Sequence, residues 1–169
     1  MKLIKAPDPW LETAVDPFDF GKTDANSTAA EMIGIMTQEG GIGLSANQVG
    51  LNAQIFVMKP YLLDSADPFA VINPVIVDID SQLQSMPEGC LSYPDLYLTI
   101  KRPKSIVAKY FDTQAQECTI HLQDIDARCF LHEFDHLQGI EFVDRTSKLK
   151  LDIAKKKQSK IRKKHGRTQ

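Results

Sequence analysis

The sequence predicts a single α+β domain in which short strands are grouped between helices. The 169 residues, of which 43% are hydrophobic and 25% charged, are typical of one ordinary globular domain. Four short segments rich in β-branched residues lie between segments whose apolar residues have helical spacing. These segments do not alternate regularly as strand and helix, which argues against a doubly wound parallel sheet.

The first elements follow from local signals. The stretch up to Asp24 is rich in proline and aspartate and predicts an extended loop. Thr28 and Glu31 fit a capping box, which predicts a helix over 28–39 that ends at Gly40. The strands are predicted at 54–58, 70–79, 105–111 and 117–122.

Two further helices complete the prediction. One spans 124–138, with Asp124 or Asp126 as its cap and Gly139 as its end, and the other spans about 148–164. Residues 148–169 hold 10 of the 20 lysines and arginines but one of the 22 acids, so this segment carries +9 and residues 1–147 carry −11. We therefore expect one domain over 1–147 and a basic C-terminal helix or tail over 148–169. Such a tail suits an anionic partner, and a merely solvated tail is an equally good interpretation.

Composition excludes several classes of protein. There is no apolar run of eighteen residues and no signal-peptide pattern, so we expect a cytoplasmic protein without a membrane partner. The three cysteines, Cys90, Cys118 and Cys129, have irregular spacing and do not suggest a disulfide framework. Free thiols in a reducing compartment are expected.

The segment CFLHEFDHLQG, residues 129–139, contains the motif HExxH. On a helix, His132 and His136 lie about 40° apart and project from one face, while Glu133 is turned about 100° from His132. The other positions of the helix are mostly apolar, which predicts that it is buried. Buried imidazoles and a buried carboxylate are costly unless paired or bound to metal, so the motif predicts a metal site with Glu133 as general base.

The third metal ligand is left open by the residues themselves. A metzincin needs a histidine where Phe142 stands, and a gluzincin needs a glutamate on a later helix, but no glutamate follows Glu141. Cys129 lies one turn before His132, and Cys90 lies in PEGCLSYP, a constrained loop or edge strand. Either thiolate is a possible ligand.

Three motifs together resemble the peptide deformylase family. They are GIGLSANQ at 41–48, EGCLS at 88–92 and HEFDH at 132–136, in the family's order. Ser45–Ala46 replaces the family's usual pair of alanines, and Leu131 replaces a common glutamine. The arginine that often follows the cysteine motif is missing, since the chain has Asp95, Leu96 and Tyr97 there.

The resemblance implies a fold and a set of roles. The fold is a deformylase-like one, with short strands around a central buried HExxH helix and a C-terminal helix. The metal ligands implied are Cys90, His132 and His136, with water in the fourth position as the nucleophile. Glu133 is implied as general base and acid, and the Gln48 amide and the Leu91 N–H as donors to the carbonyl oxygen. Glu88 and Arg102 are implied to pair behind the cysteine.

The reaction implied is removal of the formyl group from the N-terminal formyl-methionine of nascent polypeptides, with release of formate. The cofactor implied is one divalent metal ion, Fe(II) first, with Zn, Ni or Co as alternatives. The expected substrate-binding residues are Gly41, Ile42, Gly43, Leu44, Gly89 and Cys129, and Phe130 is a further candidate for the methionine pocket. The basic C-terminal segment is a candidate for binding the ribosome, and no specific DNA is expected. A zincin peptidase and a non-catalytic protein with a structural metal site are the competing functions.

Overall fold

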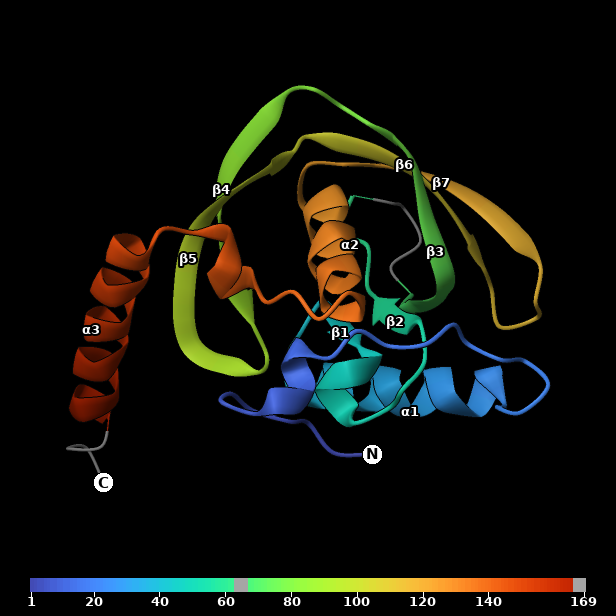
Figure 1. Ribbon diagram of the computed structural model, residues 1–169, viewed down its shortest axis with the longest axis horizontal. Helices are drawn as coiled ribbons and strands as arrows, with labels where there is room; N and C mark the ends of the chain where they lie inside the picture. The colour runs from blue at the N-terminus through green and yellow to red at the C-terminus, as the bar shows by residue number, and fades with distance from the viewer. Residues whose placement is uncertain (63–66, 166–169) are drawn as a thin grey trace.

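A computed structural model describes residues 1–62 and 67–165 of the chain (Figure 1). In this described part of the chain, seven strands form two antiparallel sheets, one of five strands in the order β1-β2-β3-β6-β7 and one of two strands, β4-β5. The strands are β1 Gly43–Ser45, β2 Ile55–Met58, β3 Phe69–Ile79, β4 Leu83–Cys90, β5 Tyr93–Pro103, β6 Ser105–Phe111 and β7 Glu117–Gln123. The helices are α1 Ala25–Gln38, α2 Asp124–Leu137 and α3 Lys148–His165, with short 3-10 turns η1 Pro9–Glu12, η2 Ala46–Val49 and η3 Phe142–Arg145.

Helix α2 occupies the centre of the molecule. Figure 1 shows the two sheets arching around it, with α1 beneath, and α2 contacts β1, β2 and β7 on one side and β5 on the other. Its side chains from Asp126 to Glu133 are all buried, and Phe130 packs edge-on against Phe56 with ring centroids 5.1 Å apart. Burial of each such large apolar side chain stabilises the fold by about 1.5–3 kcal/mol. The predicted α+β class with a central buried HExxH helix is confirmed.

The helix caps differ from those predicted, although α2 begins at Asp124 as expected. Helix α1 begins three residues earlier, because the Asp24 carboxylate, rather than Thr28, accepts hydrogen bonds from Asn26 N at 3.0 Å and Ser27 N at 3.3 Å. Neither predicted aspartate caps α2, because the N-cap position is Gln123, which makes no side-chain capping bond. The Asp126 carboxylate instead accepts hydrogen bonds from the backbone N–H groups of Tyr61 and Leu62. A tertiary contact has therefore replaced the expected local one.

The end of α2 is set as predicted by Gly139. Its φ of +70° lies in the left-handed region, where glycine is favoured. A Cβ at this position would also lie 2.4 Å from the carbonyl oxygen of Glu12. Glycine is therefore required both by the turn and by the close approach of the N-terminal segment.

The β4–β5 hairpin is absent from the predicted strands except as the possible edge strand around Cys90. The prolines at 87, 94 and 103 prevented its prediction, since proline is typical of loops. The alternation is nevertheless present, because Leu96, Leu98, Ile100 and Arg102 are buried while the residues between them are exposed. Leu96, Leu98 and Ile100 form a second small core with Phe142.

Helix α3 lies beside β5 (Figure 1). Leu151 and Ala154 pack against the second core, whereas Leu149 and Ile153 are 70% and 59% exposed. The last residues of the predicted basic tail, 166–169, lie outside the described residues. Among the helices described, none combines the length and apolar composition needed to span a membrane.

Candidate active site

Three potential metal ligands converge at the centre of the molecule. Cys90 lies at the end of β4, and His132 and His136 lie one turn apart on α2. One ligand atom of each lies within 4.8 Å of the others, and Cys90 Sγ is 3.3 Å from His136 Nε2. Bonds of about 2.0–2.3 Å in tetrahedral geometry place neighbouring donors about 3.5 Å apart, so a thiolate and two imidazoles here suit a transition metal. The structure brings together the ligand set that the resemblance implied.

Glu88 orients the first histidine. Its Oε1 lies 2.7 Å from His132 Nδ1, which leaves Nε2 of that ring for the cluster. The same carboxylate accepts two hydrogen bonds from Arg102, at 2.7 and 2.9 Å, and one from Arg128 at 2.8 Å. A carboxylate buried to this degree needs such partners to remain ionised.

Burial and pairing shift the acidities of these groups. Burial alone would raise the pKa of Glu88, but hydrogen bonds from Arg102 and His132 hold that pKa far below its usual range. Burial lowers the pKa of His136 and so favours the neutral imidazole that binds metal. Burial acts in the same direction on His132, but its hydrogen bonds with Cys90 and Glu88 raise its pKa.

The ionic network extends beyond the predicted pair of Glu88 and Arg102. Arg102 also donates to Asp135 at 2.8 Å, and Arg145 forms a second ion pair with Asp135. Sequence reasoning missed Arg128, Asp135 and Arg145. A signal was present, because Arg128 and Asp135 stand four before and three after His132, which places them on the ligand-bearing face of an otherwise apolar helix.

Glu133 is held apart from the three potential metal ligands. Its side chain is buried and its Oε2 lies 2.8 Å from the Ser45 hydroxyl, which also lies 2.8 Å from the Glu133 carbonyl oxygen. Burial raises the pKa of Glu133, although the neighbouring His132 and the Ser45 hydrogen bond oppose this shift. Ser45 stands where the family usually has an alanine, and its hydroxyl adds this contact with Glu133.

Two positions of the first motif require glycine because neighbouring side chains lie close to the backbone there. A Cβ on Gly43 would lie 2.3 Å from the Glu133 carboxylate and 2.9 Å from Cys129 Sγ, and a Cβ on Gly41 would lie 2.7 Å from the Leu91 side chain. Glycine at these two positions therefore leaves room for the protein's own side chains. Cys129 itself donates to the carbonyl of Ile42 at 3.3 Å, and burial raises the pKa of its thiol, which favours the neutral form.

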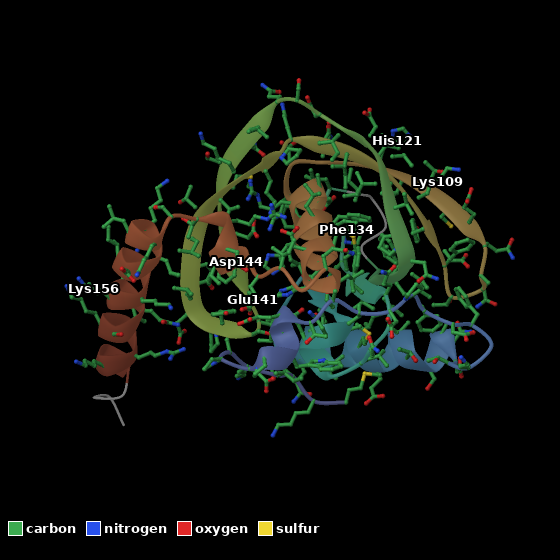
Figure 2. All side chains as sticks on the ribbon, in the orientation of Figure 1. Lys109, His121, Phe134, Glu141, Asp144 and Lys156 are labelled. Carbon is green, nitrogen blue, oxygen red and sulfur yellow. The ribbon has the colours of Figure 1, made fainter. Side chains whose placement is uncertain are left out.

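Gln48 lies beside the sulfur of Cys90. Its amide nitrogen is 3.3 Å from Cys90 Sγ and 3.1 Å from the Ser92 hydroxyl, while its oxygen accepts from Ser45 N at 2.8 Å. The amide donor therefore points into the cluster. Glu141, the last glutamate of the sequence, lies elsewhere: it accepts a hydrogen bond of 2.7 Å from the Tyr93 hydroxyl, and Figure 2 shows it near Asp144, between β5 and α2.

A cavity of about 420 Å³ opens onto this cluster. Most of the predicted substrate-binding residues line it, namely Gly41, Ile42, Gly43, Gly89 and Cys129. Gln48, Leu91, His132 and Glu133 line it as well. Leu44 and Phe130 are not among its lining residues, because both side chains are fully buried in the main core. The opposite wall comes from Tyr93–Tyr97 of β5, which sequence reasoning did not assign to the site.

Three donors for one metal, a buried carboxylate beside them and a cavity leading to both define an HExxH metallohydrolase. A family model of polypeptide deformylases matches residues 1–152. A peptide deformylase of Thermotoga maritima is 38% identical over 150 residues, which are 89% of each chain. A chloroplastic peptide deformylase 1B of Oryza sativa is 36% identical over 148 residues, 87% of this chain and 55% of that protein.

Solved structures agree. The fold is similar to that of the Thermotoga maritima enzyme, with a TM-score of 0.80, 37% identity and coverage of 86% of this chain and 97% of that one. A peptide deformylase of Synechococcus elongatus in complex with actinonin gives a TM-score of 0.86 at 34% identity, over 94% of this chain and 87% of that one. The chain belongs to the polypeptide deformylase family. It is a metal-dependent hydrolase that removes the formyl group from nascent polypeptides.

Proposed function

We propose that Cys90, His132 and His136 hold one divalent ion, and that this ion is Fe(II), with Zn, Ni or Co as substitutes. The observation that carries the proposal is the convergence of one sulfur and two imidazole nitrogens within 4.8 Å beside the cavity. Such an ion, when bound, supplies an acidified water and a polarised carbonyl at neutral pH. The donor set suits several transition metals, and the preference for iron rests on the family.

Glu133 acts in proton transfer and not in coordination. It lines the cavity next to His132, yet its carboxylate lies between Gly43 and the Ser45 hydroxyl. In the reaction it takes a proton from the attacking water and returns it to the leaving amine, so that formate and a free amino terminus result. Its burial keeps competing water away from this proton.

Gln48 and Leu91 stabilise charge on the formyl oxygen. The Gln48 amide already lies within 3.3 Å of Cys90 Sγ, and Leu91 follows Cys90 directly and lines the cavity. Donors placed in this way contribute roughly 3–4 kcal/mol each to acyl-transfer transition states.

The substrate is the formyl-methionine end of a nascent chain, with the methionine side chain in the cavity. Gly41, Ile42, Gly43, Gly89 and Cys129 are the proposed contacts, and Leu44 supports this wall from the core. A cytoplasmic location and ribosome binding through the basic segment 148–169 stay predictions. The relatives also include chloroplastic enzymes.

Formate release from a formyl-Met peptide tests the proposal, with the acetyl-Met peptide of the same sequence as the matched control. We expect release from the formyl peptide alone, loss of release on chelation and recovery when a divalent metal is restored. A metal-loaded protein that cleaves an internal peptide bond, or neither peptide, would contradict it. These outcomes would favour a peptidase or a structural metal site, respectively.

A further inference from the structure

The wall of the cavity opposite α2 is built on an irregularity of the β4–β5 hairpin. Gly89 pairs with Tyr97, but the next residue, Cys90, pairs with Tyr93. Three residues of β5, Pro94–Leu96, therefore form a bulge at the point where β4 ends in Cys90, the proposed metal ligand. Asp95, with φ of +64°, adopts the left-handed conformation that the bulge requires.

This bulge borders the site directly. Pro94, Asp95, Leu96 and Tyr97 all line the cavity together with Cys90 and Leu91. Extended backbone beside a cavity commonly orients a bound peptide, so displacement of this segment would change the space available to a substrate.

Helix α3 holds the bulge from outside. Gln158 Nε2 and Arg162 Nη2 each donate to the carbonyl oxygen of Pro94 at 2.7 Å, and Arg162 Nε lies 3.2 Å from the Asp95 carboxylate. Leu151 and Ala154, on the same face of α3, pack against the core that contains Leu96. Arg162 was expected to face an anionic partner, but its guanidinium binds the chain's own β5.

We propose that α3 positions the Pro94–Tyr97 wall of the substrate cavity, with Gln158 and Arg162 as positioning residues for peptide binding. The inference rests on the proposed deformylase function, because it assumes that the peptide lies along this wall. The bulge contributes none of the metal donors, so its loss of order weakens binding of the peptide and leaves the chemical step in place. Bulges lack ladder hydrogen bonds, and here the α3 side chains supply partners in their place.

The test uses the full chain with point variants on α3. Gln158→Ala, Arg162→Ala and the double variant remove the contacts, and Arg162→Lys keeps the charge but loses the fork that reaches both Pro94 and Asp95. Lys156→Ala is the matched control, because Figure 2 shows Lys156 on the side of α3 turned away from β5. Steady-state formate release gives KM and kcat, and amide hydrogen exchange of the peptide covering 91–97 gives the order of the wall independently of activity.

For the double variant we expect KM to rise about three- to tenfold, the range for losing two or three exposed hydrogen bonds, with kcat within about twofold of the parent. Amide exchange in 91–97 should become faster in the double variant. Arg162→Lys should give KM and exchange values between those of the parent and the double variant, and Lys156→Ala should match the parent. Unchanged exchange, or faster exchange with unchanged KM, would overturn the proposal. Failure of the parent protein to release formate would instead overturn the proposed function, while exchange would still report whether α3 holds the bulge.

Discussion

Two cysteines near the motif helix differ in what surrounds their sulfur atoms. Cys90 Sγ lies 3.3 Å from His136 Nε2, whereas Cys129 Sγ donates to the Ile42 carbonyl and its raised pKa favours a protonated thiol. We expect Cys90→Ala to lose metal and Cys129→Ala to keep both metal and most of its activity. Metal analysis of the two purified variants checks this, and the reverse pattern would move the ligand to Cys129.

The Glu133 carboxylate is predicted to matter for chemistry and not for metal binding. Glu133→Gln keeps the shape of the side chain and its contact with Ser45 but removes the base. We expect full metal content and a fall in kcat of about 10²–10⁴-fold, the usual contribution of general acid–base catalysis. Turnover close to that of the parent in a metal-loaded variant would remove Glu133 from this role.

The thiolate ligand makes the site sensitive to oxygen if the metal is ferrous iron. Ferrous iron is open to oxidation, and Cys90 itself can be oxidised to sulfenic and higher acids. Protein prepared with iron without oxygen should be more active than zinc-loaded protein and should lose activity in air. Comparison of formate release and half-life in the two preparations checks this; equal values would argue against iron as the native ion.

At the scale of elements, α2 and the β4–β5 hairpin are joined through buried charge. Arg102 on β5 pairs with Glu88 on β4 and with Asp135 on α2, and all three side chains are at most 9% exposed. Removing the arginine leaves two carboxylates with fewer partners in a water-poor environment. Such a loss is much more destabilising than the loss of a surface ion pair.

We therefore expect Arg102→Ala to lower the free energy of unfolding by about 3–5 kcal/mol. Lys101→Ala, at the neighbouring exposed position of the same strand, should change it by less than about 0.5 kcal/mol. Urea unfolding of the metal-free proteins measures both, so that loss of metal does not confuse the comparison. Similar free energies of unfolding for the two variants would mean that the buried ion pairs contribute little to the packing of the hairpin against α2.

At the scale of the whole molecule, the charges are divided between the −11 main domain and the +9 C-terminal segment. Helix α3 turns Gln158 and Arg162 toward β5 and leaves Lys157, Lys160 and Lys163 exposed. A row of exposed cations on a helix held at the edge of the molecule suits the phosphates of ribosomal RNA. The domain division at 147/148 itself remains a prediction.

Replacing Lys157, Lys160 and Lys163 by glutamine should reduce cosedimentation with ribosomes several-fold at low salt, and moderate salt should weaken binding of the parent steeply. The same change at Lys22, Lys59 and Lys109 is the control; Figure 2 shows Lys109 on β6, far from α3. Deformylation of a free peptide should stay the same in both variants. Equal cosedimentation of the two would mean that the segment is only solvated.

The sequence alone determined the parts of the protein that depend on nearby residues. The period of apolar residues placed α2 and four strands, Gly139 set the end of α2, and the HExxH spacing put two histidines on one face. The order of three motifs was enough to predict the family and, through it, Cys90. These features can be predicted from the sequence because each depends on residues that are close together in the chain.

The tertiary structure decided the rest, since it depends on residues far apart in the chain. Glu88 binds groups from β5 and α2, Ser45 meets Glu133 across 88 positions, and the bulge in β5 is held by a helix more than 60 residues later. Which side chain satisfies a buried charge is set by packing, because the energy of an ionised group depends on every partner that replaces its water. A local pattern predicts that such partners must exist but cannot identify them.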